Sequence, residues 1–394
     1  MPLAVYILGL SIFALGTSEF MLSGLLPAIA GDLGVSIPDA GLLISAFAIG
    51  MVVGAPLLAA ATLRLPRRAT LLALLAVFGI GQVVGAIAPS YGVLFGTRVV
   101  SALACAGFWA VAAASAITLV PVNRRARAMA VVTGGLTIAN IVGVPAGTFL
   151  GQHAGWRSAF WAVAALTALA VVGVLLFVPA LRPDPERMPR LRGELGAYRD
   201  ARVWLALGIT ALSSGLVFCT FSYLAPVLTD VTGLPEGWVS GALALFGVGG
   251  LIGITLGGRL ADAYPLATLF GSLAATLVTL VVLGTATSNA PLTLAAIFAL
   301  GVAGFAANPA LNARVFALAH RAPTLAGASN TSAFNIGNTA GPALGGLAID
   351  AGLGYASVAW VSAVLGVAAL GGITLAAIIQ RRDDRLPEPT LVTA

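Results

Sequence analysis

Long apolar runs alternate with short polar or proline-containing connections along the whole chain. Crossing a bilayer as a helix takes about 20 predominantly apolar residues, and each run is long enough. The pattern predicts six helices in the first half, near residues 4–28, 38–63, 69–88, 93–118, 128–151 and 157–180. Six more are predicted in the second half, near residues 203–229, 237–260, 266–287, 291–318, 324–350 and 353–379. The expected fold is therefore an all-α polytopic membrane protein with twelve transmembrane helices.

One polar stretch interrupts this series of helices. Residues 182–202 carry prolines and charges of both signs, which is typical of a loop rather than a membrane span. We therefore expect two six-helix bundles, residues 1–181 and 203–380, joined by a cytoplasmic linker at residues 182–202. The remaining residues, 381–394, are expected to form a cytoplasmic tail.

The composition excludes an ordinary soluble domain. Of the 394 residues, 59% are hydrophobic and 9% are charged, whereas soluble domains carry about 25% charged residues. The net charge of +6 comes from arginines clustered between the apolar runs, so it does not indicate binding to nucleic acid. Cytoplasmic loops of membrane proteins are enriched in arginine, and eighteen of the twenty arginines share one side when both termini lie inside. Twelve spans in a bacterial inner membrane, with cytoplasmic termini, are the consistent topology.

The two halves of the chain are related to each other. At an offset of 198 residues, Asn140 and Gly143 align with Asn338 and Gly341, among other matches. Each half has an even number of predicted helices, so both halves enter the membrane from the same side. Parallel repeats about an axis along the membrane normal are typical of transporters whose site lies at the midplane between the halves.

Several segments resemble the drug:proton antiporters of the major facilitator superfamily. The segment Gly143-Val-Pro145-Ala-Gly147 is similar to their antiporter motif, and residues 341–346 match that motif in the second half. Arg98 stands where this family has a buried arginine. The opening stretch, residues 16–27, looks most like the chloramphenicol exporters of actinobacteria, with sugar-efflux proteins as the next relatives. The resemblance covers essentially the whole chain and implies the major facilitator fold.

Two predicted loops resemble the gating signature of the same superfamily. The loop after the second helix keeps Arg64, Arg67 and Arg68, while Leu63 stands at the acidic position of the signature. The corresponding loop of the second half runs from Gly258 to Asp262 and keeps the acid. The resemblance implies that both loops take part in gating.

Glu19 is the acidic residue that lies well inside an apolar run. Ionisable groups within the membrane are rare, costly and usually functional. Because desolvation favours the neutral form of a carboxyl group, alternate exposure to water on the two sides would let Glu19 bind and release a proton. We favour this role over a fixed structural pair with Arg98. For Arg98 itself two readings stay open, namely tuning of proton release and a side chain that snorkels to the outer interface.

Amide and aromatic side chains form a second group of candidates. Neutral donors and acceptors beside aromatic surfaces suit an uncharged cargo with hydroxyl or amide groups, although hydrogen bonding between helices would explain the amides equally well. The candidate substrate-binding residues are Asn140, Phe218, Phe221, Tyr223, Asn308, Asn312, Asn335 and Asn338.

The sequence offers little for other kinds of chemistry. It contains no lysine, so a phosphate-binding loop of the Walker type is excluded. Cys105 and Cys219 lie in apolar runs, and His153 and His320 stand apart from other ligand-forming residues. No metal site, no cofactor and no enzymatic activity are expected, and the protein is expected to be a monomer in the lipid bilayer.

These patterns predict a secondary transporter that exchanges inward-moving protons for outward-moving small amphipathic drugs by alternating access. Chloramphenicol or a related amphenicol is the favoured cargo, which implies antibiotic resistance. Export of sugars or other hydroxylated metabolites is the alternative within the same class. A channel or an intramembrane enzyme is the alternative from a different class.

Overall fold

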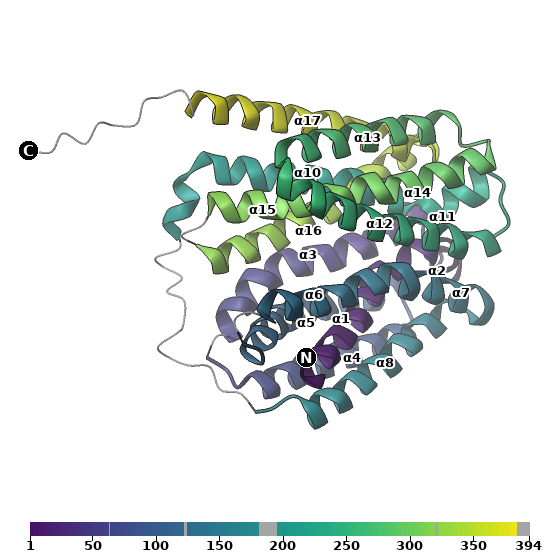
Figure 1. Ribbon diagram of the computed structural model, residues 1–394. Helices are drawn as coiled ribbons and strands as arrows, with labels where there is room; N and C mark the ends of the chain where they lie inside the picture. Colours follow the sequence, from purple (N-terminus) through teal and green to yellow (C-terminus); the bar gives the residue numbers. More distant parts are fainter. Residues whose placement is uncertain (63, 122–123, 181–194, 320–321, 384–394) are drawn as a thin grey trace, which may run out of the picture.

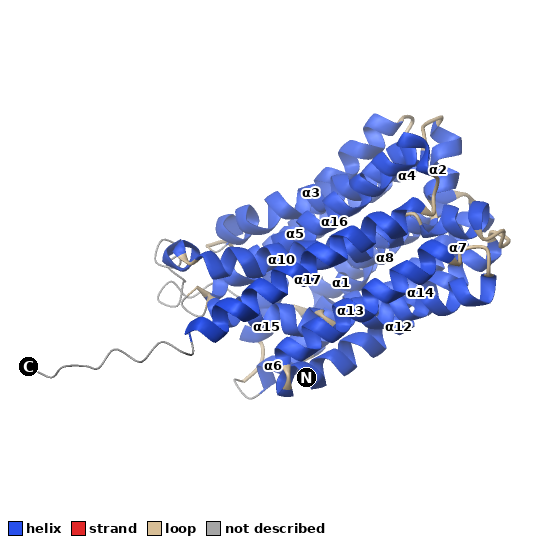
Figure 2. Ribbon diagram, turned by 90° about the horizontal axis from the view of Figure 1, so that it is seen from above, coloured by secondary structure: helices blue, strands red, loops and turns tan. Residues whose placement is uncertain are grey.

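The computed structural model describes residues 1–62, 64–121, 124–180, 195–319 and 322–383. Within these ranges the chain is helical and contains no strand (Figure 2). The first half consists of α1 (Leu3–Phe20), the 3-10 helix η1 (Met21–Gly24), α2 (Leu26–Leu33), α3 (Ile37–Thr62), α4 (Arg67–Ala86), α5 (Tyr91–Thr118), α6 (Arg125–Ile138), the π-helix η3 (Ala139–Gly143), α7 (Val144–Ala154) and α8 (Trp156–Phe177).

The second half begins with the short 3-10 helix η5 (Leu195–Arg199) and continues with a matching series. Its elements are α10 (Ala201–Ser222), α11 (Leu224–Pro226), the π-helix η6 (Val227–Val231), α12 (Gly237–Ala263), α13 (Pro265–Thr285), α14 (Ala290–Ala306), α15 (Asn308–Leu318), α16 (Pro323–Ala348), the π-helix η7 (Ile349–Leu353) and α17 (Ser357–Asp383).

The predicted helices correspond to these elements, but three of them are broken: those near residues 203–229 and 291–318 are interrupted at Tyr223 and Ala307, and the first is interrupted beside Glu19. Where the sequence predicts one helix near residues 4–28, α1 ends at Phe20 and α2 starts at Leu26. Pro27 lies in the first turn of α2, where the missing N–H of proline breaks no helical hydrogen bond. The break therefore comes directly after Glu19 and Phe20.

Eleven candidate spans within the described ranges have the length and hydropathy needed to cross a membrane. α16 is not among them, since asparagine, serine and threonine interrupt its apolar sequence. It packs along α10 on one side and α3 on the other, so it is the twelfth long helix of the bundle. The prediction of an all-α polytopic fold is confirmed.

The helices form two groups that lie side by side, α1–α8 and α10–α17 (Figure 1). Each group has its own large apolar core, and α3 meets α16 at the boundary. Most of the predicted linker, residues 182–194, and most of the predicted tail, residues 384–394, lie outside the described residues. We call the end of the bundle that holds the α3–α4 turn and the end of α17 the inner end, after the orientation that the arginines predict, and the opposite end the outer end.

Equivalent glycines hold equivalent helices together in the two halves. A Cβ atom added to Gly143 of η3 would lie 2.0 Å from Oγ1 of Thr17 in α1, and one added to Gly341 of α16 would lie 2.4 Å from the carbonyl oxygen of Gly215 in α10. Both contacts are related by the offset of 198 residues. The internal repeat therefore extends from the sequence to the packing of the helices.

Two arginines of the predicted gating loop satisfy the ends of neighbouring helices. Arg67 donates to the carbonyl of Ala114 over 2.7 Å and to the hydroxyl of Thr118, near the end of α5, and Arg68 donates to the carbonyl of Leu175, near the end of α8. Cations are favourable at helix C-termini, where carbonyl groups lack partners. Arg64, Gly258 and Asp262 lie at the same inner end, where Arg64 and Asp262 are exposed.

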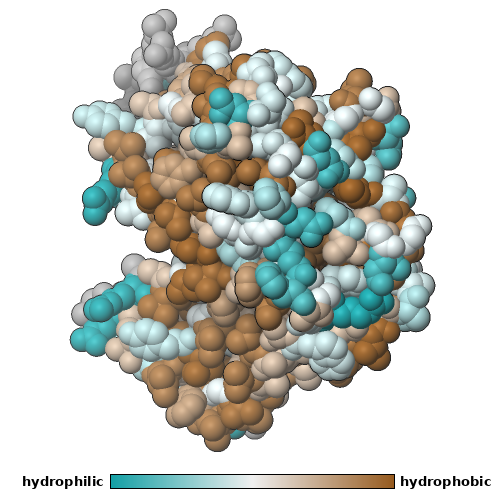
Figure 3. Space-filling view, turned by 90° about the vertical axis from the view of Figure 1, so that its right-hand side faces the viewer, coloured by the Kyte–Doolittle hydropathy of each residue, from teal (hydrophilic) through white to brown (hydrophobic). Residues whose placement is uncertain are grey.

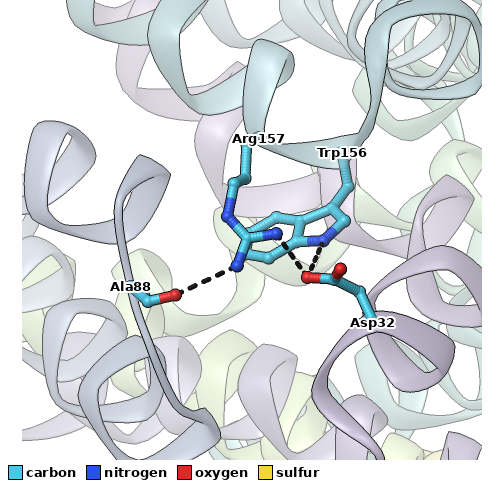
Figure 4. A network of polar contacts seen from close by, with 4 residues as sticks. All are labelled: Asp32, Ala88, Trp156 and Arg157. Carbon is cyan, nitrogen blue, oxygen red and sulfur yellow. Dashed lines mark hydrogen bonds and ion pairs between the residues drawn. The ribbon is translucent and has the colours of Figure 1, made fainter.

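A polar cluster joins three segments at the outer end, where hydrophilic side chains gather between apolar areas (Figure 3). Gly155, with a φ of 79°, makes the turn into α8 and places Trp156 and Arg157 at its start. Arg157 forms an ion pair with Asp32 of α2, and Nε1 of Trp156 donates to the same carboxylate over 3.1 Å. Arg157 also donates to the carbonyl of Ala88 over 3.1 Å and lies over the Trp156 ring (Figure 4). This outer clamp explains why the sequence places an arginine in an outer loop.

Candidate functional site

Glu19 lies in the last turn of α1, directly before the break at η1. The residue is 8% exposed, and among the other acidic residues whose burial the structure describes, none is buried. No hydrogen bond or ion pair from its carboxyl group to another described residue is formed. The protein therefore presents an acid without a fixed partner inside a membrane-spanning helix, which is the arrangement that proton exchange requires.

Arg98 of α5 is buried beside this acid, with only 1% of its surface exposed. One terminal nitrogen donates to the hydroxyl of Ser18 over 2.9 Å, and the other donates to the main-chain carbonyl of Glu19 over 3.3 Å. The guanidinium lies over the ring of Phe47, 4.4 Å from its centroid, and its Nε has no hydrogen-bond partner among the described residues. Arg98 thus holds the main chain of α1 at the point where the helix ends.

A buried glutamine completes this network. The Ser18 hydroxyl donates to Oε1 of Gln82 over 3.0 Å, and Nε2 of Gln82 donates to the hydroxyl of Ser101 over 3.3 Å. α1, α4 and α5 are thereby tied together beside Glu19. Ser18, Gln82 and Ser101 were missed as site residues by sequence reasoning, although a glutamine within an apolar run is a signal that could have been used.

The geometry excludes one of the interpretations that the sequence left open for Arg98. Its burial is incompatible with a side chain that snorkels to the outer interface. A fixed ion pair with Glu19 is also absent, because the guanidinium reaches the main-chain oxygen of Glu19 and not its carboxylate within 4.0 Å. What the structure brings together is a buried cation and an acid that is close but not paired.

The antiporter-like segment packs against the same part of α1. Gly143 contacts Thr17, and a Cβ atom added to Gly147 would lie 3.3 Å from Cβ of Met21. Pro145 lies in the first turn of α7, where proline is tolerated. The motif therefore contacts the residues on both sides of Glu19 and allows the close approach that positions them.

Aromatic rings extend from the neighbour of Glu19 into the second half. Phe20 stacks on Phe218 with ring centroids 5.0 Å apart, and Phe218 meets Phe221 edge-on at 5.6 Å. Phe221 stacks on Phe246 at 4.5 Å, and Phe246 meets Phe305 at 5.6 Å. Phe218 and Phe221 were predicted as candidates for substrate contact, whereas Phe20, Phe246 and Phe305 were not, because nothing in the local sequence shows that their rings meet.

Two of the predicted asparagines present free acceptor oxygens. The amide nitrogen of Asn140 donates to the carbonyl of Leu136, and that of Asn335 donates to the carbonyl of Thr331. Because a carbonyl oxygen only accepts hydrogen bonds, the amide nitrogen must be the bonded end of each side chain. Oδ1 is therefore the end that points away. Both Oδ1 atoms are buried without a partner among the described residues, so each site offers an acceptor to a donor group of a ligand.

The other predicted asparagines are engaged within the second half. Asn338 accepts a hydrogen bond from Ser214 of α10 over 2.5 Å. Asn312 donates to the carbonyl of Asn308 over 2.9 Å and accepts from Asn330. The bonds of Asn338 to Ser214 and of Asn312 to Asn330 match the helix-to-helix role that the sequence left as an alternative. The bond to Asn308 lies within α15 and uses the main-chain carbonyl of Asn308. Asn330, whose own Oδ1 is buried without a partner among the described residues, is a polar residue that the sequence reasoning did not select.

Tyr223 is placed in an interface between helices. Its side chain has no exposed surface, and its hydroxyl donates to the carbonyl of Pro342 over 2.9 Å. A Cβ atom added to Gly41 of α3 would lie 2.4 Å from that hydroxyl. In this conformation Tyr223 therefore joins α10, α16 and α3, and a contact with substrate would require this interface to open.

α1 and α10 meet at the Phe20–Phe218 stack, and both become more exposed toward the inner end. Both helices carry one ring of the Phe20–Phe218 stack, and residues spaced by four and three positions share a helical face. On α1 that face changes from exposed to buried toward the stack, through Tyr6, Leu10, Phe13, Thr17 and Phe20. On α10 the equivalent positions show the same gradient, through Trp204, Gly208, Ala211, Gly215 and Phe218.

The outer side of the stack is closed. The four residues of η1 are almost completely buried, and a Cβ atom added to Gly24 would lie 2.0 Å from Thr148 and 2.8 Å from Leu243 of α12. α12 also packs much more extensively on α7 and η3 than on α6. The halves are therefore packed closely on the outer side of Glu19, whereas the surfaces of α1 and α10 are more exposed toward the inner end.

Comparisons with known proteins agree with this architecture. The sequence profile of the Major Facilitator Superfamily matches residues 8–334. A chloramphenicol resistance protein of Streptomyces lividans is 43% identical over 94% of this chain and 95% of its own length. The inner membrane transport protein YdhP of Escherichia coli K12 is 39% identical over 92% of this chain and 93% of its own length.

More distant relatives also align over nearly the whole chain. A probable sugar efflux transporter of Mannheimia succiniciproducens is 29% identical over 93% of this chain and 91% of its own length. Among solved structures, a bacterial homologue of the human lysosomal transporter Spinster, inward-facing and unoccupied, superposes with a TM-score of 0.78 over 98% of this chain and all of its own. At 20% sequence identity, this match supports the fold alone. The resemblance that the motifs indicate is thus confirmed, and the chain belongs to the major facilitator superfamily, a family of multi-pass secondary transporters and not of enzymes.

Proposed function

We propose that this protein exports chloramphenicol or a related amphenicol from the cytoplasm in exchange for protons. The observation that carries the proposal is the 43% identity to a chloramphenicol resistance protein over nearly the full length of both chains. The cell membrane is the proposed location, with both termini in the cytoplasm, since the relative from Escherichia coli is named an inner membrane transport protein.

The described residues support proton exchange at Glu19. Its carboxyl group is buried, lacks a fixed partner among the described residues and lies next to the Phe20–Phe218 stack, where α1 and α10 meet. A carboxyl group in such a place is stable in its neutral form, whereas its charged form needs water or a cation. Rocking of the two halves would bring water to Glu19 from each side in turn, which couples proton movement to the conformational change.

The side chains around the boundary support an amphipathic cargo. The aromatic rings of α10 offer an apolar surface, while Asn140 and Asn335 offer acceptor oxygens. A ligand that fits must combine an apolar ring with donor groups such as hydroxyl or amide N–H. Chloramphenicol has an aromatic ring, two hydroxyl groups and an amide, so its donors match the free acceptors.

Drug susceptibility of a pump-deficient bacterial host tests this function directly. We expect cells that express the protein to tolerate more chloramphenicol than cells with an empty vector, and cells with an equal amount of the Glu19→Gln variant to gain no tolerance. Unchanged chloramphenicol tolerance together with protection against sugar stress would overturn the amphenicol assignment. Sugar export, for which the 29% identical relative is named, would then take its place.

A further inference from the structure

The stacked pair Phe20 and Phe218 occupies equivalent positions in the two halves. The two residues are separated by 198 positions, the offset that relates the repeats, and their rings lie 5.0 Å apart at an angle of 25°. When equivalent residues of two repeats contact each other, the contact lies on the axis that relates the repeats. The stack therefore lies on the central axis of the molecule, where a transport path between the halves must pass.

Along that axis, the stack lies between more exposed residues on its inner side and completely buried residues on its outer side. Phe20 and Phe218 are 6% and 8% exposed, while Met21 and Cys219, the next residue of each chain segment, have no exposed surface. On the inner side, the facing surfaces of α1 and α10 become progressively more exposed. The two rings thus keep a small exposed surface, whereas the residue that follows each of them has none.

The same turn of α1 is held from both halves. Arg98 of the first half bonds to Ser18 and to the carbonyl of Glu19, whereas the ring of Phe20 is part of the apolar core of the second half. Glu19 and Phe20 are therefore consecutive residues that join the two halves, and a change of charge at Glu19 acts on this segment. A charged carboxylate cannot remain in this sealed position without water or a cation, so its formation favours separation of the rings.

From these contacts we propose that the Phe20–Phe218 stack is the central contact of the outer gate, with the buried η1 segment on its outer side, and that Phe20 is the positioning residue that transmits the charge state of Glu19 to the second half. This inference rests on the proposed proton exchange at Glu19. It adds a gate composed of one residue from each repeat, which closes when Glu19 is neutral and opens outward when Glu19 is charged.

Accessibility of a cysteine below the stack tests the gate without measuring transport. The reporter is Ala211→Cys, a half-buried position on the inner side of Phe218, in a chain whose buried Cys105 and Cys219 are replaced by alanine. A membrane-impermeant maleimide is applied to vesicles of either orientation. We expect fast labelling from the inner side and slow labelling from the outer side.

Removal of the Phe20 ring should change only the slow labelling of the cysteine from the outer side. We expect Phe20→Ala to raise labelling from the outer side on the order of tenfold, within the range of typical coupling between sites. Phe20→Tyr, which keeps a ring, and Phe78→Ala, which removes a fully buried ring from α4, should leave it unchanged. An unchanged rate in Phe20→Ala, or an equal increase in Phe78→Ala, would overturn the gate.

A second substitution tests the link to Glu19. Glu19→Gln keeps the residue neutral and should lower labelling from the outer side, while in the Phe20→Ala background it should have no further effect. An equal effect of Glu19→Gln with and without Phe20 would contradict the positioning role. Because labelling requires no drug, a protein that did not export chloramphenicol would still give a clear answer about the gate.

Discussion

Glu19 and Arg98 are neighbours that do not form an ion pair in this conformation. The guanidinium is bonded to Ser18 and to the main chain of Glu19, and its Nε is left without a partner among the described residues. A buried donor without a partner carries a free-energy cost, which a carboxylate turned toward it would relieve. We infer that the pair forms in another step of the cycle, so that Arg98 stabilises the charged state of Glu19 only transiently.

Glu19→Gln should therefore eliminate exchange of protons and leave the fold intact. Glutamine has nearly the same shape and remains neutral, so it mimics the protonated acid without releasing a proton. We expect proton-driven drug transport in vesicles to fall on the order of 100-fold, the scale of effect seen when a side chain that transfers a proton is lost. The amount of protein in the membrane should equal that of the wild type.

Glu236→Gln is the matched control for this change. Glu236 is exposed at the start of α12, and the same substitution there should leave transport unchanged. Undiminished transport by Glu19→Gln under a pH gradient would rule out Glu19 as the proton carrier. A loss of the protein from the membrane would instead indicate a structural role.

At the scale of elements, the outer clamp joins α2, the α4–α5 turn and the start of α8 without crossing to the second half. Its contacts are consistent with a first bundle that moves as one body. Hydrogen bonds from Arg157 and Trp156 lower the pKa of the Asp32 carboxyl below its usual value. The clamp consequently stays ionised on a side of the membrane that is acidic whenever the proton gradient is present.

Removing the clamp should lower the thermal stability of the protein in a pH-dependent way. Because the pKa of Asp32 is lower in the folded state, its ionised form contributes stability above the usual pKa of 3.8, and this contribution is lost as the pH falls through the lowered value. We expect Arg157→Gln to melt at a lower temperature than the wild type at neutral pH, with the difference shrinking in acid. Both side chains are more than a third exposed, so the shift should be small.

A double-mutant cycle identifies the pair as the cause. Asp32→Asn should lower the melting temperature as well. The double variant should melt no lower than the less stable of the two single variants, because both substitutions remove the same interaction. Additive losses at neutral pH, or a difference that grows in acid, would contradict the role of the Asp32–Arg157 pair.

Helices were predictable from the sequence because apolar length is a local property, whereas contacts between helices were not. α16 illustrates both sides, since its amide-rich sequence lacks the hydropathy of a span yet its place follows from the repeat and from the alternating topology. Glu19 and Arg98 were found because single charges stand out within apolar runs. The roles of Gln82 and Phe20 depend on partners 64 and 198 positions away, and no local pattern specifies which faces of distant helices meet.

At the scale of the whole molecule, the two bundles pack closely on the outer side of Glu19, and α3 and α16 also join them farther toward the inner end. If the proposed exchange is correct, drug and proton would use the path between the halves in turn rather than a continuous pore. Movement of the drug should then depend on the proton gradient, whereas a channel or a uniporter would let the drug equilibrate without it.

Reconstitution into liposomes distinguishes these mechanisms. For molecules whose outer end faces the lumen, an acidic lumen supplies protons that leave through Glu19 while chloramphenicol enters, so labelled drug should accumulate above its external concentration. An ionophore that exchanges protons for potassium should abolish this accumulation, because it removes the pH difference that drives it. If the drug instead reached the same concentration on both sides at the same rate with and without the gradient, exchange at Glu19 would not be part of the transport cycle, and the path between the halves would have to be that of a uniporter.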